Sequence, residues 1–331
     1  MSTTVLPDRV AATPAVSATP ALRGLFWLAI RQNRLLLWVL GALLALVVAD
    51  LAWIHLSMRH IVDNLQQAGC ESSSSWSDKN CWNLVSPLHY PTFWYTDILQ
   101  PAVTAVPLLI GVFIGAPLLA QEHERGTIRL IRAQSVSPIR WLAVRLAVPG
   151  LAVLAVSGVL ATLMTWVWWT DIVHGSGAFD PPFQFFTYPV LGLAPIAWSL
   201  FALALGVLVG QLIRRTLPAM VLTGALVAAI HGLVLWARPS LYPAVDRVAA
   251  LRTTEPTNSW LLDRGIVLAD GSRVSTSACG FSFSTDCDDA TASWLRYHPA
   301  DHLVPVQLVE TGLLLTLTLL LLLAAFRRIR A

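Results

Sequence analysis

The chain has 331 residues, of which 56% are hydrophobic and only 12% are charged. Its formal net charge is +3 and its mean hydropathy is +0.64. Soluble domains carry about 25% charged residues, so this composition excludes an ordinary soluble globular protein. It indicates a chain whose solvent is largely the lipid bilayer.

The N-terminal segment has the composition of a tail followed by a surface helix. Residues 1–20 are rich in Ala, Thr, Ser, Val and Pro and lead into no apolar h-region, so we expect a disordered cytoplasmic tail and not a cleaved signal peptide. In residues 21–34 the side chains of Arg23, Arg31 and Arg34 fall on one side of a helical wheel. This pattern predicts an amphipathic interfacial helix, with a helical extension of the first span as the alternative.

Six stretches are long and apolar enough to cross a bilayer. A hydrocarbon core of about 30 Å requires about 20 helical residues at ~1.5 Å per residue. We therefore predict an all-α membrane protein with six transmembrane helices. The predicted spans are 35–57, 98–120, 142–168, 188–212, 218–237 and 304–326.

The distribution of arginine predicts the orientation of these spans. If both termini are cytoplasmic, the short inside segments hold 14 of the 22 basic residues, and only Asp8, Glu122 and Glu124 are acidic there. Positive charge in short loops marks the cytoplasmic side, so we expect an N-in, C-in protein of the plasma (inner) membrane. Because topology accounts for the arginines, no nucleic-acid partner is expected. The inside residues are Arg9, Arg23, Arg31, Arg34, Arg125, Arg129, Arg132, Arg140, Arg145, Arg214, Arg215, Arg327, Arg328 and Arg330.

The segment between the fifth and sixth spans, 238–303, is too long and polar for a simple connection. Within it, Asp270-Gly271 separates two short β-like runs, 265–269 and 272–275, a pattern that is typical of a hairpin. We therefore predict a small extracytoplasmic domain between the fifth and sixth helices, followed by the sixth span and a basic tail in 304–331.

Four cysteines lie in the predicted outside loops, where an oxidising compartment permits disulfides. Cys70 and Cys81 share the loop after the first span, and Cys279 and Cys287 share the loop before the last. Two local bridges are favoured. Free thiols, or one bridge between the two loops, are the alternatives.

Two spans carry small residues at four-residue spacing, which lets helix backbones approach closely in lipid. Packing within one bundle is sufficient to explain these faces, and a subunit interface is the alternative. The residues are Ala202, Gly206 and Gly210 in the fourth span, and Gly224, Ala228 and Gly232 in the fifth.

Polar side chains within the predicted spans form a second set of candidates. Asp50, His231 and Glu310 are predicted at a similar depth towards the outer side, and Gln307 lies on nearly the same helix face as Glu310. A charge facing lipid costs roughly 2.5–3.5 kcal/mol or more, so these side chains are expected to face protein or water. Three arrangements are open. The side chains form one shared intramembrane polar cluster, or each has a separate local partner or extends to the membrane interface. In the third arrangement they relay protons.

The stretch 121–141 has the pattern of a helix end, a short helix and a new helix start. Gly126 is suited to end the second span, and Thr127 is suited to cap a short helix whose basic side carries Arg129 and Arg132. Ser137-Pro138 then reads as an N-cap followed by proline at the first helical position. This element is either a rigid contact site for a cytoplasmic partner or a helix on the membrane surface whose arginine side chains snorkel to the headgroups.

The same stretch resembles the type-2 ATP-binding-cassette (ABC) exporter permeases. In that family the second span ends in an E-x-E-x-G-T pattern, matched here by Glu122, Glu124, Gly126 and Thr127, and an S-x-x-R-W-like turn opens the third, matched by Ser137, Arg140 and Trp141. The stretches from Tyr297 and from Glu310 also resemble actinobacterial members.

The resemblance implies a dimer of six-span permeases, with a second copy or a paralogue, and two cytoplasmic ABC ATPase subunits. It also implies that the loop after the second span couples to the ATPase. Membrane lipids are the remaining expected partners. The coupling candidates are then Glu122, Glu124, Arg125, Gly126, Thr127, Arg129 and Arg132.

The sequence lacks the usual enzyme motifs. It contains no G-x-x-x-x-G-K-[ST] phosphate loop, no H-E-x-x-H and no C-x-x-C, so we expect neither catalysis nor a metal or cofactor in this chain, with ATP and Mg on a partner ATPase. The favoured function is export of an amphipathic or hydrophobic substrate. The alternatives are a proton-coupled secondary transporter that uses Asp50 and Glu310, and a membrane-embedded enzyme or sensor subunit.

Overall fold

The computed structural model describes Arg31 and residues 34–70, 79–126, 137–169, 180–251, 255–275 and 290–330. Six helices in this part of the chain are long and apolar enough to cross a membrane, so the chain is a multi-pass membrane protein. The predicted tail and interfacial helix fall almost entirely outside the described residues. The spans are α2 (Arg34–Gln67), a run from α3 to α6 (Lys79–Glu124), α8 (Pro138–Trp168), α10 (Ala194–Ile213), α11 (Thr216–Ala237) and α13 (Leu303–Arg330).

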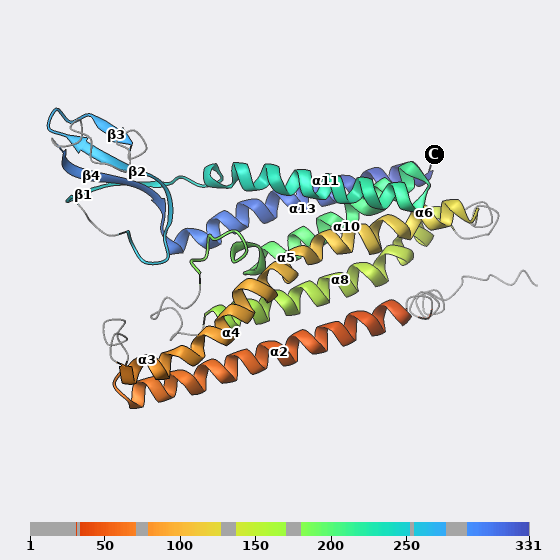
Figure 1. Ribbon diagram of the computed structural model, residues 1–331. Coiled ribbons are helices and arrows are strands. Elements are labelled where there is room, and N and C mark those ends of the chain that lie inside the picture. Colours follow the sequence, from red (N-terminus) through yellow and green to blue (C-terminus); the bar gives the residue numbers. More distant parts are fainter. Residues whose placement is uncertain are drawn as a thin grey trace, which may run out of the picture.

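The helices lie side by side as one elongated bundle (Figure 1). The C-terminal end of α13, the end of α6 and the start of α2 lie at one end, and a small β-sheet, the end of α2 and α3 lie at the other. Helix α10 occupies the centre, because it packs against α6, α8, α11 and α13. It is apolar on nearly all sides and most of its residues are buried, as expected of a helix with no polar face.

Small residues allow α10 to approach the second helix closely. A Cβ atom at Gly206 would lie 2.5 Å from the main-chain oxygen of Gly111, and one at Gly210 would overlap the oxygen of Ala116. The small-residue face of the fourth span is therefore an intrachain contact. In the fifth span, a Cβ at Gly224 would lie 3.3 Å from Val112, whereas one at Gly232 would meet nothing within 4 Å.

The second helix is a continuous but irregular run. Its parts are α3 (Lys79–Val85), η2 (Ser86–Leu88), α4 (His89–Phe93), the π-helical η3 (Trp94–Leu99), α5 (Gln100–Leu109), the π-helical η4 (Ile110–Gly115) and α6 (Ala116–Glu124). Proline recurs along it, and each proline removes one backbone donor, which favours the local changes of helical pitch.

The first two helices are longer than predicted. Helix α2 continues ten residues beyond the predicted end at 57, because Met58, Val62 and Leu65 are buried at helical spacing. The facing extension, Lys79–Trp94, likewise buries Cys81 and Leu88 in the same core cluster. Mean apolarity does not detect such amphipathic extensions, since half of their residues are polar.

The fourth helix, in contrast, begins later than predicted, at Ala194 and not at 188. A short 3₁₀ turn, η5 (Tyr188–Val190), precedes it. Gly192 then takes φ +58°, a conformation that an α-helix does not contain, and its N–H donates to Thr165 Oγ1 at 2.9 Å.

A disulfide joins Cys70 to Cys81 across the α2–α3 connection. This confirms the first of the two predicted local bridges. Cys279 and Cys287 lie outside the described residues, so the second bridge stays a prediction. The bond links the residue that follows α2 by three positions to α3, beside the buried cluster that the two helices share.

Replacing Cys70 with serine is expected to lower the free energy of unfolding by about 2–3 kcal/mol. Without the bond, the unfolded chain is no longer restricted by a closed loop of this length, and it gains conformational entropy. Thermal unfolding of the purified protein with and without reductant measures the loss. A double variant, Cys70→Ser with Cys81→Ser, should respond less to reductant than the unmodified protein, by the contribution of this bond. If it still responds by the same amount, the stabilising bond lies elsewhere.

The segment between α11 and α13 is a four-stranded antiparallel sheet. Its strands are β1 (Val245–Ala249), β2 (Trp260–Leu268), β3 (Arg273–Ser275) and β4 (Ala290–His298), in the order β1-β4-β2-β3. The predicted hairpin is confirmed, because β2 pairs with β3 and Gly271 takes φ +83° in the turn. The predicted all-α class therefore holds for the spans only. The pairing of β4 with β1 and with β2 joins residues far apart in the chain, and it was not predicted.

Polar and aromatic contacts attach the sheet to the bundle. The imidazole of His298, at the end of β4, lies 3.1 Å from the oxygen of Pro239 and 3.1 Å from His302. The rings of Phe183 and Trp260 stack at 5.2 Å beside it. Burial lowers the pKa of His298, so the ring stays neutral and keeps these contacts at neutral pH.

Candidate functional site

The turn between α6 and α8 has the helix end and helix start that the sequence predicts. Helix α6 ends at Glu124, Gly126 takes φ +71°, and its N–H donates to the His123 oxygen at 3.2 Å. Helix α8 begins at Pro138, and Ser137 Oγ accepts from the Arg140 N–H at 3.4 Å. The predicted coupling residues Thr127, Arg129 and Arg132 lie between these points, outside the described residues.

The two glutamates at the end of α6 bind different helices. The Arg145 guanidinium of α8 donates to Glu122 Oε1 at 2.9 Å, and both side chains are about one-fifth exposed. The Thr216 hydroxyl, at the start of α11, donates to Glu124 Oε2. Residues two apart on a helix point to nearly opposite sides, so the E-x-E spacing lets one turn of α6 hold two neighbouring helices.

Two contacts, Glu122–Arg145 and Glu124–Thr216, join the end of α6 to its neighbouring helices. Together they are called the brace. A displacement of the α6–α8 turn would act on α8 through the first contact and on α11 through the second. The same end of the bundle exposes several arginines. They are Arg125, Arg140, Arg214, Arg215, Arg327 and Arg328.

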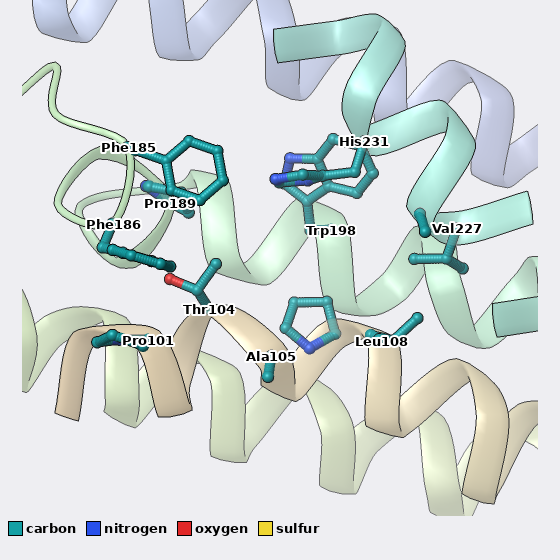
Figure 2. A pocket seen from close by; sticks show the side chains of 12 residues that line it. Pro101, Thr104, Ala105, Leu108, Phe185, Phe186, Pro189, Trp198, Val227 and His231 are labelled. Atoms are coloured by element: carbon teal, nitrogen blue, oxygen red, sulfur yellow. The ribbon is translucent and has the colours of Figure 1, made fainter. Parts of the chain in front are cut away.

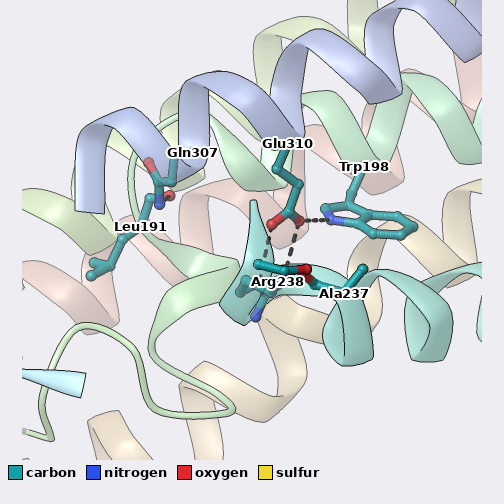
Figure 3. Close-up of polar contacts among 7 residues, drawn as sticks. Leu191, Trp198, Ala237, Arg238, Gln307 and Glu310 are labelled. Atoms are coloured by element: carbon teal, nitrogen blue, oxygen red, sulfur yellow. Dashed lines mark hydrogen bonds and ion pairs between the residues drawn. The ribbon is translucent and has the colours of Figure 1, made fainter. Parts of the chain in front are cut away.

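A buried ion pair lies near the opposite end of the bundle (Figure 3). Arg238 follows α11, in the 3₁₀ turn η6 (Arg238–Ser240), and donates to both carboxylate oxygens of Glu310 at 3.0 and 3.2 Å. Trp198 Nε1 donates to Glu310 Oε1 at 2.8 Å. Arg238 is 3% exposed and Glu310 1%, so each charge depends on the other for its compensation.

The structure brings together some of the predicted intramembrane residues. His231 packs on the ring of Trp198 at 4.7 Å, next to Glu310. Gln307, about one turn from Glu310 on α13, donates to the Leu191 oxygen at 2.9 Å. Asp50 lies apart from this group, since it accepts from Trp94 Nε1 at 2.8 Å between α2 and the second helix.

Sequence reasoning did not single out Arg238 or Trp198. One signal could have found the arginine: a glutamate predicted within a span requires a counter-charge, and Arg238 directly follows the fifth span on the same side. The guanidinium also lies 3.8 Å above the ring of Tyr188, a contact that only the loop before α10 provides.

A pocket of about 290 Å³ opens between α5, α10, α11 and the loop that precedes α10 (Figure 2). Its wall is mostly apolar, with aromatic rings at one side and proline and leucine at the other. Trp198 belongs to both the wall and the ion-pair contact. Lining residues include Pro101, Leu108, Phe185, Phe186, Trp198 and His231.

Residues 41–238 match the family described as ABC-2 membrane transporter related, which covers more than half of the chain and includes the brace. The chain belongs to this family. No curated protein and no solved structure matches it. Proteins of the ABC-2 family are membrane subunits that are not themselves catalytic and that work with an ABC ATPase. The matched region ends at Arg238, so the sheet and α13 lie beyond it.

Proposed function

We propose that this ABC-2 protein is the permease subunit of an exporter in the plasma membrane, and that it works as a dimer with two cytoplasmic ABC ATPase subunits. The end of the bundle that carries the α6–α8 turn and the C-terminus faces the cytosol, and the sheet faces the outside. The exposed arginines at the first end support this orientation.

The brace is the observation on which the proposal rests. An ABC permease receives its energy from a separate ATPase, so it needs a point where force from that partner enters, and that point must be linked to more than one span. Glu122 links the turn to α8 and Glu124 links it to α11, and α11 packs on the central α10. Closure of the ATPases against this turn would therefore move α6, α8 and α11 together.

A proton-coupled mechanism through Asp50 and Glu310 has less support. Glu310 is held by two hydrogen bonds from Arg238 and one from Trp198, so its carboxylate oxygens are already engaged by partners within the bundle. Asp50 lies on another helix pair, with Trp94 as its partner. Within the described residues, the two carboxylates therefore have different hydrogen-bond partners on different helices.

An amphipathic or hydrophobic cargo fits the pocket between α5 and α11. The wall is mostly apolar, and Phe185, Phe186 and Trp198 contribute aromatic surface. Such walls bind apolar groups mainly through area removed from water.

The brace predicts a charge-exchange result. Glu122→Arg and Arg145→Glu should each lower ATP hydrolysis by the reconstituted complex at least about fivefold, because a typical coupling free energy of 1–3 kcal/mol corresponds to a factor of about 5–150. The double variant should recover most of the activity, since it restores the ion pair in reverse. The measurement uses the ATPase that co-purifies with the full chain, in proteoliposomes.

Arg264→Glu serves as the matched control, because its ion pair with Glu255 is exposed and lies on the sheet. It should leave ATP hydrolysis unchanged. Equal activity of all variants would remove the brace from the mechanism, and failure to find any associated ATPase would refute the proposed function itself.

A further inference from the structure

The segment that supplies the aromatic side of the pocket lies outside the long helices. Residues 181–193, called the wall segment, precede α10 as turns and the short η5, and Phe185, Phe186 and Pro189 within them line the pocket. Leu191 is nevertheless buried. Backbone without helical partners inside a membrane protein must have its N–H and C=O groups bound by other groups, so the partners of this segment decide its position.

One side chain of α13 binds both sides of the turn that ends the wall segment. Gln307 Nε2 donates to the Leu191 oxygen at 2.9 Å, and the Leu193 N–H donates to Gln307 Oε1 at 3.4 Å. Figure 3 shows the side chain of Gln307 beside Leu191. Gln307 is 4% exposed, so a main-chain group that lost this amide would be left unpaired in a buried site.

The residue between these two contacts fits closely against Gln307. Gly192 takes φ +58°, and a Cβ atom there would overlap Gln307 Oε1. Its N–H donates to Thr165 Oγ1 on α8 at 2.9 Å. The end of the wall segment is therefore held between α8 and α13, and only glycine lets the amide approach so closely.

This contact acts on the pocket without being part of its lining. Pro189 lines the pocket and lies two residues before Leu191, so a shift of the turn is carried directly into the wall. The lining residues all fall within the matched region 41–238, whereas Gln307 lies beyond it. The position of the aromatic wall thus depends on a helix outside the family region.

We infer that Gln307 is a positioning residue for the pocket, because its amide fixes the wall segment through Leu191 and Leu193. An amide both donates to a carbonyl and accepts from an N–H, and these are the two groups that the turn presents. The inference rests on the proposed function in one respect only, because it takes the pocket as the place where cargo binds.

Fluorine NMR of the wall tests the inference. The full-length chain carries trifluoromethyl-phenylalanine in place of Phe186 and is measured in phosphatidylcholine nanodiscs, without ATPase or cargo. The reference line is that of this labelled chain without further substitution. We expect Gln307→Leu to displace or broaden the line, because leucine can neither donate nor accept a hydrogen bond.

Gln307→Glu provides a conservative rescue. At about pH 5 the buried carboxyl is protonated, so it can donate to the Leu191 oxygen and accept from the Leu193 N–H, and the reference line should return. It should be lost again as the carboxyl ionises. The reference chain recorded at the same pH values accounts for titration of His231 and Glu310. If Gln307→Leu does not fold, this pH series decides alone.

Gln211→Leu is the matched control. Gln211 is also buried, and its amide donates to the Ala325 oxygen at 3.4 Å near the other end of the bundle, so its loss should leave the line in place. Thermal unfolding of each variant verifies its fold. The inference is overturned by a reference line in Gln307→Leu, by an equal displacement in Gln211→Leu, or by a line of Gln307→Glu that stays displaced in acid. None of these results touches the proposed function, which co-purification of an ATPase tests separately.

Discussion

Arg238→Met is expected to lower the free energy of unfolding by about 3–5 kcal/mol, the cost of leaving one member of a buried ion pair uncompensated. Glu310 would then remain 1% exposed, with Trp198 as its remaining donor. No water or lipid headgroup reaches such a site without opening the contact between α10, α13 and η6. Thermal unfolding or steric trapping of the protein in bicelles measures the loss.

Two further variants separate charge compensation from packing. The double variant Arg238→Met with Glu310→Met should recover most of the loss, because it removes both charges and keeps an apolar filling. Arg264→Met breaks an ion pair whose side chains are 60% and 43% exposed, and it should change stability by at most about 1 kcal/mol. A double variant as unstable as the single one would show that geometry, and not charge, holds this site.

Gly206→Ala is expected to destabilise the bundle by several kcal/mol, although alanine is the better helix former by about 1 kcal/mol. The new methyl group would lie 2.5 Å from Gly111 oxygen and 2.7 Å from Ala116 nitrogen, both main-chain atoms of the second helix. Main-chain atoms cannot rotate away, so the two helices must separate. Unfolding temperature and yield of folded protein report the effect.

Gly232→Ala is the same substitution in α11, where a Cβ meets nothing within 4 Å. It should be neutral or stabilising by up to about 1 kcal/mol. The two substitutions are therefore expected to change the free energy of unfolding in opposite directions. Equal, small effects at both positions would contradict close packing of α10 against the second helix.

The brace and the ion pair lie at opposite ends of the bundle, and α11 connects them. Thr216 at its first turn binds Glu124, and Arg238 just after its last residue binds Glu310. Between these points α11 lines the pocket with Val227 and His231. In the proposed function, a displacement of the end of α6 would therefore act along α11 on the pocket and on the base of the sheet.

Local signals in the sequence determined several features without reference to the rest of the chain. Apolar length identified the six spans, Gly126 and Ser137-Pro138 marked the helix end and the helix start, and Asp270-Gly271 marked the hairpin turn. Each depends on the conformational preference of a few adjacent residues or on a hydropathy sum. The eleven-residue separation of Cys70 and Cys81 likewise made a local bridge the favoured choice.

Tertiary structure alone decided the partners of the charged and strand residues. From the sequence, several basic residues could be the partner of Glu310, and only the packing of α10, α13 and η6 selects Arg238. The same holds for Glu122 with Arg145 and for the strand order β1-β4-β2-β3. Such pairings join residues far apart in the chain, so they depend on how whole helices and strands pack, and local preference carries no information about that.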